Sequence, residues 1–371
     1  VAEFAIGRKT QLSPVGAFDK IAPMSGWRLV GFLGVGSAFV ILSFYGVVGG
    51  WILKYVLISF NGGFEALDSN PEAAASLFSN FIQSTWSPIF FQIFFMTLCI
   101  IVIINGVKKG IESWSKIMMP IIILLLFALA IKGLIMPGGV NGLKFLFFPR
   151  FSDLTASSIV LALGHSFFTL SLGMGTMITY GSYLNKKQNL IKSALWVIFL
   201  DTFIALLAGV AIFSTVFALK ADPAGGPGLI FFVLPSIFPQ LAYGTIWSTL
   251  FFSLLFMAAL TSAISILEVV TSYMIDQKSW SRKKATLIFG SLITIVGVFC
   301  SLSMGGGINL TSWMDKTFFD FMDELSSKYM LPIGGLLTAV FVLKEWGVKS
   351  FVSELSQKII GEKEDILIFK I

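Results

Sequence analysis

Two closely spaced glycines interrupt a long apolar stretch. Such an interruption is a candidate site for binding ions or substrate. The segment is GHSFFTLSLGMG, 164–175, in which Gly173 and Gly175 bracket Met174. Glycine weakens a helix by about 1 kcal/mol and permits backbone outside the helical pattern. A break inside a membrane exposes carbonyls and helix ends that bind ions and substrate. Close packing of small residues between helices explains the same spacing about equally well.

A second polar group lies in the segment AALTSAISILE, 258–268. Ala258, Thr261 and Ser262 are spaced i, i+3 and i+4, which places them on one face of a helix. A free carbonyl and hydroxyls on such a face are hard oxygen ligands that suit a small alkali cation. Hydrogen bonding within a membrane helix is the alternative use of serine and threonine. Glu268, two turns further on, is interpreted as a residue paired near the helix end.

Two single polar residues lie deep in other apolar stretches. Asp201 follows about nine residues of an uncharged run, where an acid costs about 2.5–3.5 kcal/mol on insertion scales. It must face a cavity, a cation or a donor, so sodium, a proton and a structural hydrogen bond all remain open. Tyr45 lies near the middle of another run. Its hydroxyl needs a partner, either a substrate carboxylate or a neighbouring helix.

Two further features bear on gating and on proton transfer. Gly110 and Pro120 enclose nine residues at the start of an apolar stretch, and the pair can loosen that helix entrance or form an ordinary start with a proline kink. His165 is the only histidine. We interpret it as a hydrogen-bonded core histidine in preference to a proton carrier.

Composition excludes several classes of protein. Hydrophobic residues make up 56% of the 371 residues and charged residues 12%, about half the roughly 25% of soluble proteins; mean hydropathy is +0.88. This mixture argues against a soluble enzyme, a disordered chain and a nucleic-acid-binding domain. With no Cys/His cluster and no paired intramembrane acids, the sequence predicts that the protein is not an enzyme.

The apolar stretches predict a polytopic all-α membrane protein. A helix needs about 20 apolar residues to cross the bilayer. Eight stretches of that scale recur, and we expect one transmembrane domain over 1–346, followed by a cytoplasmic linker and the start of a truncated segment over 347–371. The eight stretches are 29–53, 87–107, 116–132, 154–185, 193–219, 243–274, 285–304 and 318–343.

The basic residues predict the orientation of these spans in the cytoplasmic membrane. If the first connection is cytoplasmic and the spans alternate, 19 of the 26 Lys and Arg residues lie on the cytoplasmic side and seven on the other. This bias follows the positive-inside rule and explains the basic charge without an acidic ligand. The segments predicted to be cytoplasmic are 8–28, 108–116, 186–192, 278–284 and the C-terminal segment.

Two external connections and the first residues carry structure of their own. The stretch 59–86 is polar and is expected as a surface loop. The stretch 222–243 holds four prolines around GLIFFVLPSIF, which predicts either short helices dipping into an external vestibule or a loop packed on its neighbours. The opening residues, VAEFAIG, are interpreted as the tail of a helix already in progress.

Together these motifs resemble the neurotransmitter:sodium symporter family, in its bacterial amino-acid-transporter branch, from about Glu3 to Trp346. FFTLSLGMG followed by ITYGSY is similar to the broken sixth helix of that family, and LTSAISILE to its eighth. The interval Gly110–Pro120 and the segment AEFAIGR are similar to its fifth and second helices. The resemblance implies two inverted five-helix repeats with discontinuous helices, incomplete here because the first helix and most of the second are missing.

The resemblance also implies roles for individual residues. Two sodium sites are expected, and Asp201, where relatives often have asparagine, implies that chloride is not required. The register at the outer gate is ambiguous between Asp320 and Asp323. The implied roles are Thr169 and Asp201 for the first sodium ion; Ala258, Thr261 and Ser262 for the second; Ile41, Tyr45, Phe168, Ser171, Met174, Ser262 and Ile266 for substrate; and Phe168, Asp323, Gly110 and Pro120 for gating.

We therefore expect sodium-coupled symport of a hydrophobic or aromatic amino acid by alternating access, with the amino acid, sodium ions and the lipid bilayer as partners. This chain is expected to be a fragment that is inactive alone. A proton-coupled permease of the same architecture and a non-transporting receptor or scaffold on the same fold are the alternatives. A homo-oligomer remains open.

Overall fold

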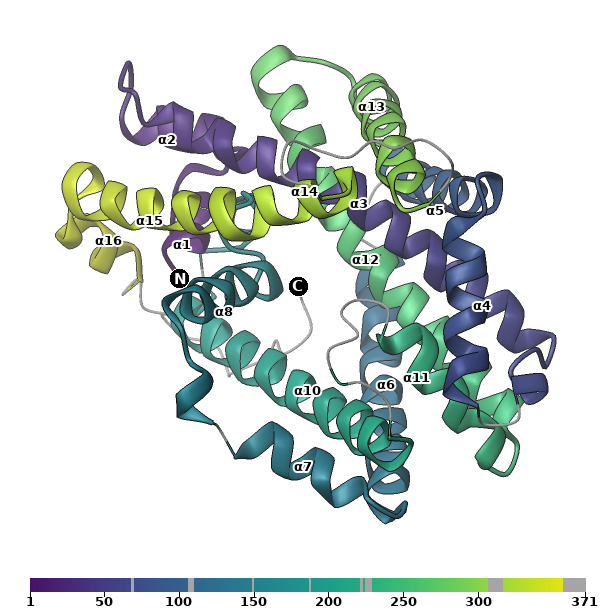
Figure 1. Cartoon of the computed structure of the whole chain (residues 1–371). Helices are drawn as coiled ribbons and strands as arrows, with labels where there is room; N and C mark the ends of the chain where they lie inside the picture. The colour runs from purple at the N-terminus through teal and green to yellow at the C-terminus, as the bar shows by residue number, and fades with distance from the viewer. Residues whose placement is uncertain are drawn as a thin grey trace.

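The computed structural model describes residues 1–67, 70–105, 110–148, 150–186, 188–220, 223, 229–305 and 316–355, and these form an array of helices (Figure 1). The helices are α1 (Ala2–Thr10), α2 (Pro14–Ile21), α3 (Arg28–Phe60), α4 (Pro71–Gln83), α5 (Trp86–Asn105), α6 (Gly110–Ile135), α7 (Gly139–Phe147), α8 (Ala156–Thr169), α9 (Thr176–Tyr183), α10 (Leu190–Ala218), α11 (Leu229–Ile237), α12 (Gly244–Lys278), α13 (Arg282–Ser303), α14 (Phe318–Glu324), α15 (Leu331–Phe341) and α16 (Val348–Leu355).

Six helical stretches among the described residues are long and apolar enough to cross a membrane. They are α3, α5, α10, α12, α13 and the continuous stretch Phe318–Trp346, which joins α14 and α15 through a π-helical turn, Leu325–Met330. The other two predicted spans differ from simple crossings. The third belongs to α6, whose axis turns by 113° into α7, and the fourth is divided into α8 and α9.

The centre of the molecule is built around α3, which packs against α12, α5, α13 and α2. Its glycines allow this close packing: a Cβ atom at Gly50 would lie 2.6 Å from the backbone nitrogen of Gln92 on α5. By contrast, α10 is only 11% buried over its most apolar window, against 67% for α3. Large exposed apolar side chains on α10 match a surface that faces lipid.

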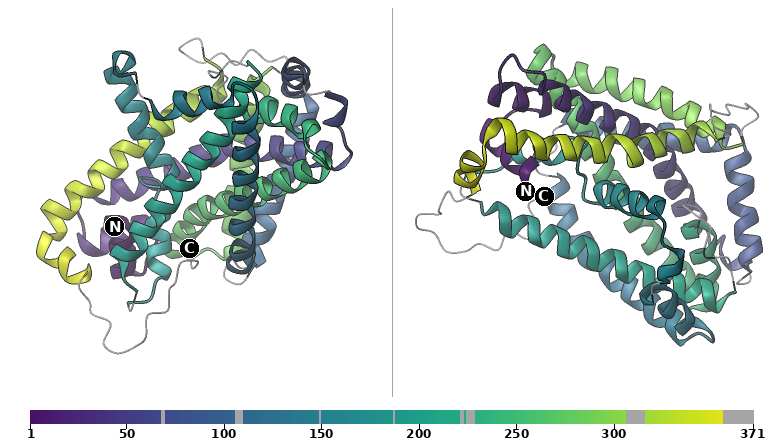
Figure 2. Two further views of the ribbon diagram at one scale, coloured as in Figure 1. Left: turned by 90° about the horizontal axis from the view of Figure 1, so that it is seen from below. Right: turned by 60° about the vertical axis from the view of Figure 1, so that its left-hand side comes forward.

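Most of the buried apolar residues belong to one large cluster and one smaller cluster. The large one joins α3, α5, α12 and neighbouring segments. The smaller one, which we call the α1 cluster, joins α1, α2, α9 and the end of the last span. α15 runs beside α3 and α8, and α16 lies against α1 at the end where the N-terminus lies (Figures 1 and 2). The helical character predicted for the opening residues is confirmed for Ala2 to Gly7, which belong to α1.

Three connecting regions can be compared with their predictions. The stretch 59–86, expected as a surface loop, contains α4, in which Ala74, Phe78 and Phe81 are buried in the large cluster. That expectation is wrong, because apolar residues at helical spacing within this polar stretch pack against the core.

Residues 229–240 form α11 and a 3-10 turn, Phe238–Gln240. The side chains of Phe231, Val233, Leu234, Ile237 and Phe238 are buried. Short helices and packing on neighbours are therefore both observed, while most of 221–228 lies outside the described residues. In the region predicted as a linker, residues 348–355 form α16, and 356–371 lie outside the described residues.

Candidate functional site

The predicted break in the fourth span is present. α8 ends at Thr169 and α9 begins at Thr176. Between them Ser171, Gly173 and Gly175 have φ angles of 54°, 77° and 76°, in the left-handed region that side chains rarely adopt. A Cβ atom at Gly173 would also lie 2.3 Å from the carbonyl oxygen of Leu331. The glycines therefore permit an irregular backbone conformation. They also allow close packing against α15, so both interpretations of their spacing apply.

A residue that the sequence reasoning missed holds this break. Glu3 is buried, and its Oε1 accepts a hydrogen bond from the backbone N–H of Gly173 at 2.7 Å. Its Oε2 has no hydrogen-bond partner among the described residues. Backbone that leaves a helix needs such a partner. An acid inside the apolar run VAEFAIG was the only signal in the sequence.

The polar face predicted on α12 is also present. The Thr261 hydroxyl donates to the carbonyl of Ala258 at 2.8 Å, and the Ser265 hydroxyl donates to the carbonyl of Thr261 at 2.8 Å. Ser262 is exposed. The hydroxyls of Thr261 and Ser262 and the Ala258 carbonyl thus lie within about one turn. This set of hard oxygens fits a sodium ion, and Thr261 also makes the bond within its own helix that the alternative interpretation requires.

Most of the predicted substrate residues come together beside this face. Ile41, Met174 and Ile266 are buried in the large apolar cluster, and Tyr45 and Phe168 pack at its edge. The Phe168 ring stacks against Phe44 with 6.4 Å between centroids. The Tyr45 hydroxyl interacts with the Ser262 side chain, and Ser171 is half-buried within the break. α3, α12 and the break therefore contribute to one apolar cluster, and a Cβ atom at Gly175 would lie 3.2 Å from the Val269 side chain of α12.

No hydrogen bond is observed between Thr169 and Asp201, the two residues of the predicted first sodium site. Asp201 is half-buried on α10, and it forms no hydrogen bond or ion pair with any residue that the structure describes. Thr169 is exposed at the end of α8, where its hydroxyl donates to the carbonyl of Ser166 at 3.3 Å. A shared role for these two residues stays a prediction.

The candidate gating residues lie in three places. Thr317 caps α14, because its hydroxyl accepts from the backbone N–H of Asp320 at 3.1 Å. The same hydroxyl donates to Oδ2 of the exposed Asp320 at 2.7 Å. Asp323 is half-buried. Its carboxylate takes no part in the Thr317–Asp320 contact. Gly110 begins α6, and Pro120 lies inside the same helix.

His165 differs from its prediction. The structure places it exposed on α8, and it forms no hydrogen bond with a described residue. The expectation of a buried, hydrogen-bonded histidine is therefore wrong, because His165 occupies an exposed position on α8.

Glu268 is paired, as expected. Its carboxylate is buried and receives two hydrogen bonds from Arg282, at 2.6 and 2.9 Å, and one from the Tyr183 hydroxyl at 2.8 Å. A two-point contact of this kind fixes direction as well as distance. It ties α12 to the start of α13 and to the end of α9.

Comparisons with known proteins agree with this geometry. The model of the sodium:neurotransmitter symporter family matches residues 79–369. An uncharacterized sodium-dependent transporter of Bacillus subtilis, YhdH, is 42% identical over 342 residues, which cover 92% of this chain and 75% of that protein. An uncharacterized sodium-dependent transporter of Haemophilus influenzae is 33% identical over 358 residues, covering 92% of this chain and 77% of that protein.

A solved structure extends the likeness to the fold. The crystal structure of MhsT in complex with L-phenylalanine matches with a TM-score of 0.91 and 44% identity, covering 95% of this chain and 80% of MhsT. The predicted all-α, multi-spanning architecture with a broken helix is thus confirmed. On the family match and the identity to these relatives, the chain belongs to the sodium:neurotransmitter symporter family.

Proposed function

We propose that this chain carries the transport site of a sodium-coupled symporter for a hydrophobic or aromatic amino acid. The observation that carries the proposal is the meeting of the irregular backbone at 170–175 with the buried side chains Ile41, Met174 and Ile266. Irregular backbone provides dipoles and carbonyls for charged groups, while the apolar surface suits an apolar side chain. The structure of MhsT with L-phenylalanine, at 44% identity, supports this choice of substrate class.

Each part of the substrate has a proposed partner. Tyr45 binds the carboxylate, since its hydroxyl lies at the polar edge beside Ser262. Ile41, Met174 and Ile266 line the side-chain pocket, Ser171 contributes from the break, and Phe168 acts as the lid. Asp323 serves as the outer-gate acid, because the Asp320 carboxylate already accepts a hydrogen bond from the Thr317 hydroxyl.

Two sodium ions accompany the amino acid in this proposal. One takes Ala258, Thr261 and Ser262 as ligands. The other takes Thr169 and Asp201. The carboxylate of Asp201 supplies negative charge within α10, so chloride is not needed for charge compensation.

In the proposed orientation, the side of the molecule that contains Arg8 faces the cytoplasm, and the protein spans the cytoplasmic membrane. The bias of basic residues supports it. Alternating access then requires the cytoplasmic side to open, and the interval Gly110–Pro120 loosens to hydrate the second sodium site.

The direct test is uptake of labelled phenylalanine and leucine into proteoliposomes by the protein expressed from its complete gene. We expect uptake with an inward sodium gradient and none when potassium replaces sodium. Equal uptake in potassium contradicts sodium coupling. Sodium-dependent binding without uptake supports a receptor on the same fold.

Asp201→Asn separates sodium coupling from proton coupling. A sodium ligand tolerates the amide oxygen, so we expect sodium-dependent uptake to persist with a change in sodium affinity of about tenfold or less. A proton carrier would lose coupled uptake entirely. Replacing chloride by gluconate should leave wild-type uptake unchanged, and dependence on chloride would contradict the role given to the Asp201 charge.

A further inference from the structure

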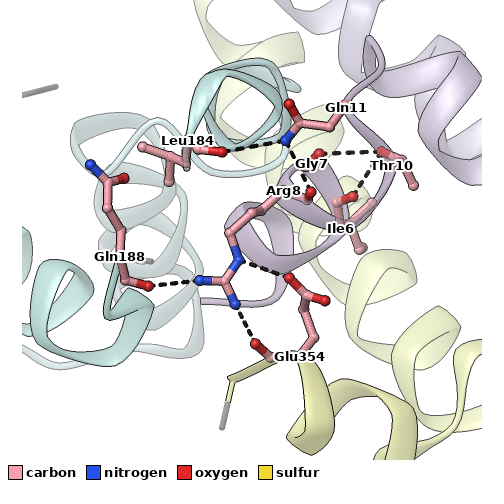
Figure 3. Close-up of polar contacts among 8 residues, drawn as sticks. All are labelled: Ile6, Gly7, Arg8, Thr10, Gln11, Leu184, Gln188 and Glu354. Carbon is pink, nitrogen blue, oxygen red and sulfur yellow. Dashed lines mark hydrogen bonds and ion pairs between the residues drawn. The ribbon is translucent and has the colours of Figure 1, made fainter. Parts of the chain in front are cut away.

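A buried ion pair lies at the last turn of α1 (Figure 3). Arg8 is 1% exposed and Glu354, on α16, is 2% exposed. The Arg8 Nε donates to Glu354 Oε1 at 2.8 Å, although the two residues are 346 positions apart in the chain. None of the roles proposed above uses this pair.

All three nitrogens of the Arg8 guanidinium are engaged. Nη1 donates to the backbone carbonyl of Gln188 at 2.7 Å, and Nη2 donates to the backbone carbonyl of Glu354 (Figure 3). We call Arg8, Gln188 and Glu354 the Arg8 network. The planar fork of arginine meets these three acceptors at once, which a lysine ammonium on a flexible stem does not reproduce.

The network joins three segments that lie far apart in the sequence. Arg8 belongs to α1, Gln188 to the connection between α9 and α10, and Glu354 to the last turn of α16. A positive charge beside the carbonyls of a last helical turn also favours that helix end. The position of α16 therefore depends on Arg8.

α1 in turn is fitted to α9, the second half of the broken helix. A Cβ atom at Gly7 would lie 2.0 Å from the Ile178 carbonyl oxygen, and one at Gly181 would lie 2.5 Å from the Phe4 carbonyl oxygen. Backbones this close cannot slide past each other without a steric clash. Phe351 and Leu355 of α16 pack against the same α1 cluster, so α1, α9 and α16 form one packed unit.

A buried ion pair is weak evidence for stability, because apolar residues of similar volume often stabilise a fold equally well. An ion pair with three defined hydrogen bonds does, however, fix a single arrangement of its partners. That arrangement is lost when the charged groups separate and water hydrates them. The apolar contacts of Phe351 and Leu355 lack that directionality.

We propose that Arg8 and Glu354 are positioning residues that lock α16 onto the α1–α9 unit and thereby hold the cytoplasmic side closed. This rests on the transport function proposed above. When the lock is intact, α9 keeps the position that presents the break at 170–175. When Arg8 and Glu354 separate, Arg8 also releases the Gln188 carbonyl just beyond the end of α9, so that α9 parts from α1 and the cytoplasmic side opens.

The test uses a cysteine that reports opening. Ser182 on α9 is buried, and its backbone faces Gly7, so Ser182→Cys reacts with a maleimide only when α1 and α9 part. The native cysteines, Cys99 and Cys300, are fully buried, and protein with Ser182 intact measures their background. Glu354→Gln removes the charge of the pair, and Lys349→Gln is the control because it removes an exposed charge from the same helix.

We expect Glu354→Gln to raise the labelling rate about fivefold or more, in the range of usual coupling between sites, and Lys349→Gln to leave the rate at the wild-type value. Equal rates in the two variants overturn the proposal. The double variant Arg8→Met/Glu354→Leu leaves no unpaired buried charge. It provides the measurement if Glu354→Gln alone does not fold. It loses the contact with Gln188, so it too should label faster, and a wild-type rate in it also overturns the proposal.

Transport measurements separate positioning from a purely structural role. Glu354→Gln should weaken the apparent affinity for external substrate by a similar factor of about fivefold, with the maximal rate per inserted protein nearly unchanged. A structural role alone lowers only the amount of inserted protein, and that result counts against the lock. If the wild-type protein shows no sodium-dependent binding, the proposed function fails, but the labelling comparison remains readable.

Discussion

The break at 170–175 and the Arg8 network use polar groups in opposite ways. At the break, Glu3 Oε2 and the Thr176 hydroxyl are buried without a hydrogen-bond partner among the described residues, while Thr169 and Ser262 are exposed. In the Arg8 network every guanidinium nitrogen has an acceptor within the protein. Unpaired groups are costly unless something else binds them. This contrast is in line with the two proposals, that the break binds ligands and that the network maintains a conformation.

The largest expected effect comes from removing one member of the network. Arg8→Met leaves the buried Glu354 carboxylate without its partner, which should cost about 3–5 kcal/mol of stability. Adding Glu354→Leu should recover most of that loss, since no buried charge then remains. Apparent melting temperature and unfolding in sodium dodecyl sulfate measure both. An equal loss in the single and double variants would show that lost packing, and not the unpaired charge, is responsible.

At the break, the sharpest change is Gly173→Ala. The residue has a φ of 77°, and its new Cβ atom would lie 2.3 Å from the Leu331 carbonyl oxygen, so we expect a loss of about 1–3 kcal/mol from backbone strain together with loss of sodium-dependent binding. Gly26→Ala is the matched control, because nothing lies within 4 Å of its Cβ position. Normal binding by Gly173→Ala would mean that the break does not serve the ligand site.

The face of α12 should respond in affinity more than in stability. Ser262→Ala removes one proposed oxygen ligand from an exposed position, and a contact of the size of a hydrogen bond to a charged group is worth about 1.5–3 kcal/mol, or about 10- to 100-fold in sodium affinity. Ser272→Ala, on the same helix, removes a hydroxyl that donates to the Val269 carbonyl and should leave sodium affinity unchanged. The readout is the sodium dependence of amino-acid binding.

The smallest effect is expected at a partly exposed ion cluster. Glu324 contacts Lys316 and Lys328, and the three side chains are 27–38% exposed. Glu324→Gln should change stability by less than about 1 kcal/mol, because water replaces the lost partners. A loss as large as that of Arg8→Met would contradict the argument that burial makes the Arg8 network costly to break. Melting temperature in the same detergent provides the comparison.

Several features of the site could be predicted from local sequence. Gly173 and Gly175 predicted the break, since glycine adopts positive φ values more readily than other residues. The i, i+3, i+4 spacing placed Ala258, Thr261 and Ser262 on one face of α12. The acid in an apolar stretch at Glu268 indicated a buried partner. Each of these inferences uses residues a few positions apart.

Other features depend on contacts that no local pattern encodes. Glu3 and Gly173 are 170 residues apart, and the pair was missed. The exposed position of His165 on α8 was also missed, because the apolar character of a span does not say which of its faces another helix covers. The pairing of Arg8 with Glu354 appears only once α16 is seen folded back onto α1.

By itself the sequence determined where the long apolar helices run, where one must break, and which side chains carry the polar groups, because these follow from apolar length, glycine content and helical periodicity. The tertiary structure alone decided which distant polar groups meet: Glu3 with Gly173, Tyr45 with Ser262, and Arg8 with Glu354. The physical reason is that backbone propensity acts over a few residues, whereas these partners are chosen by how whole helices pack.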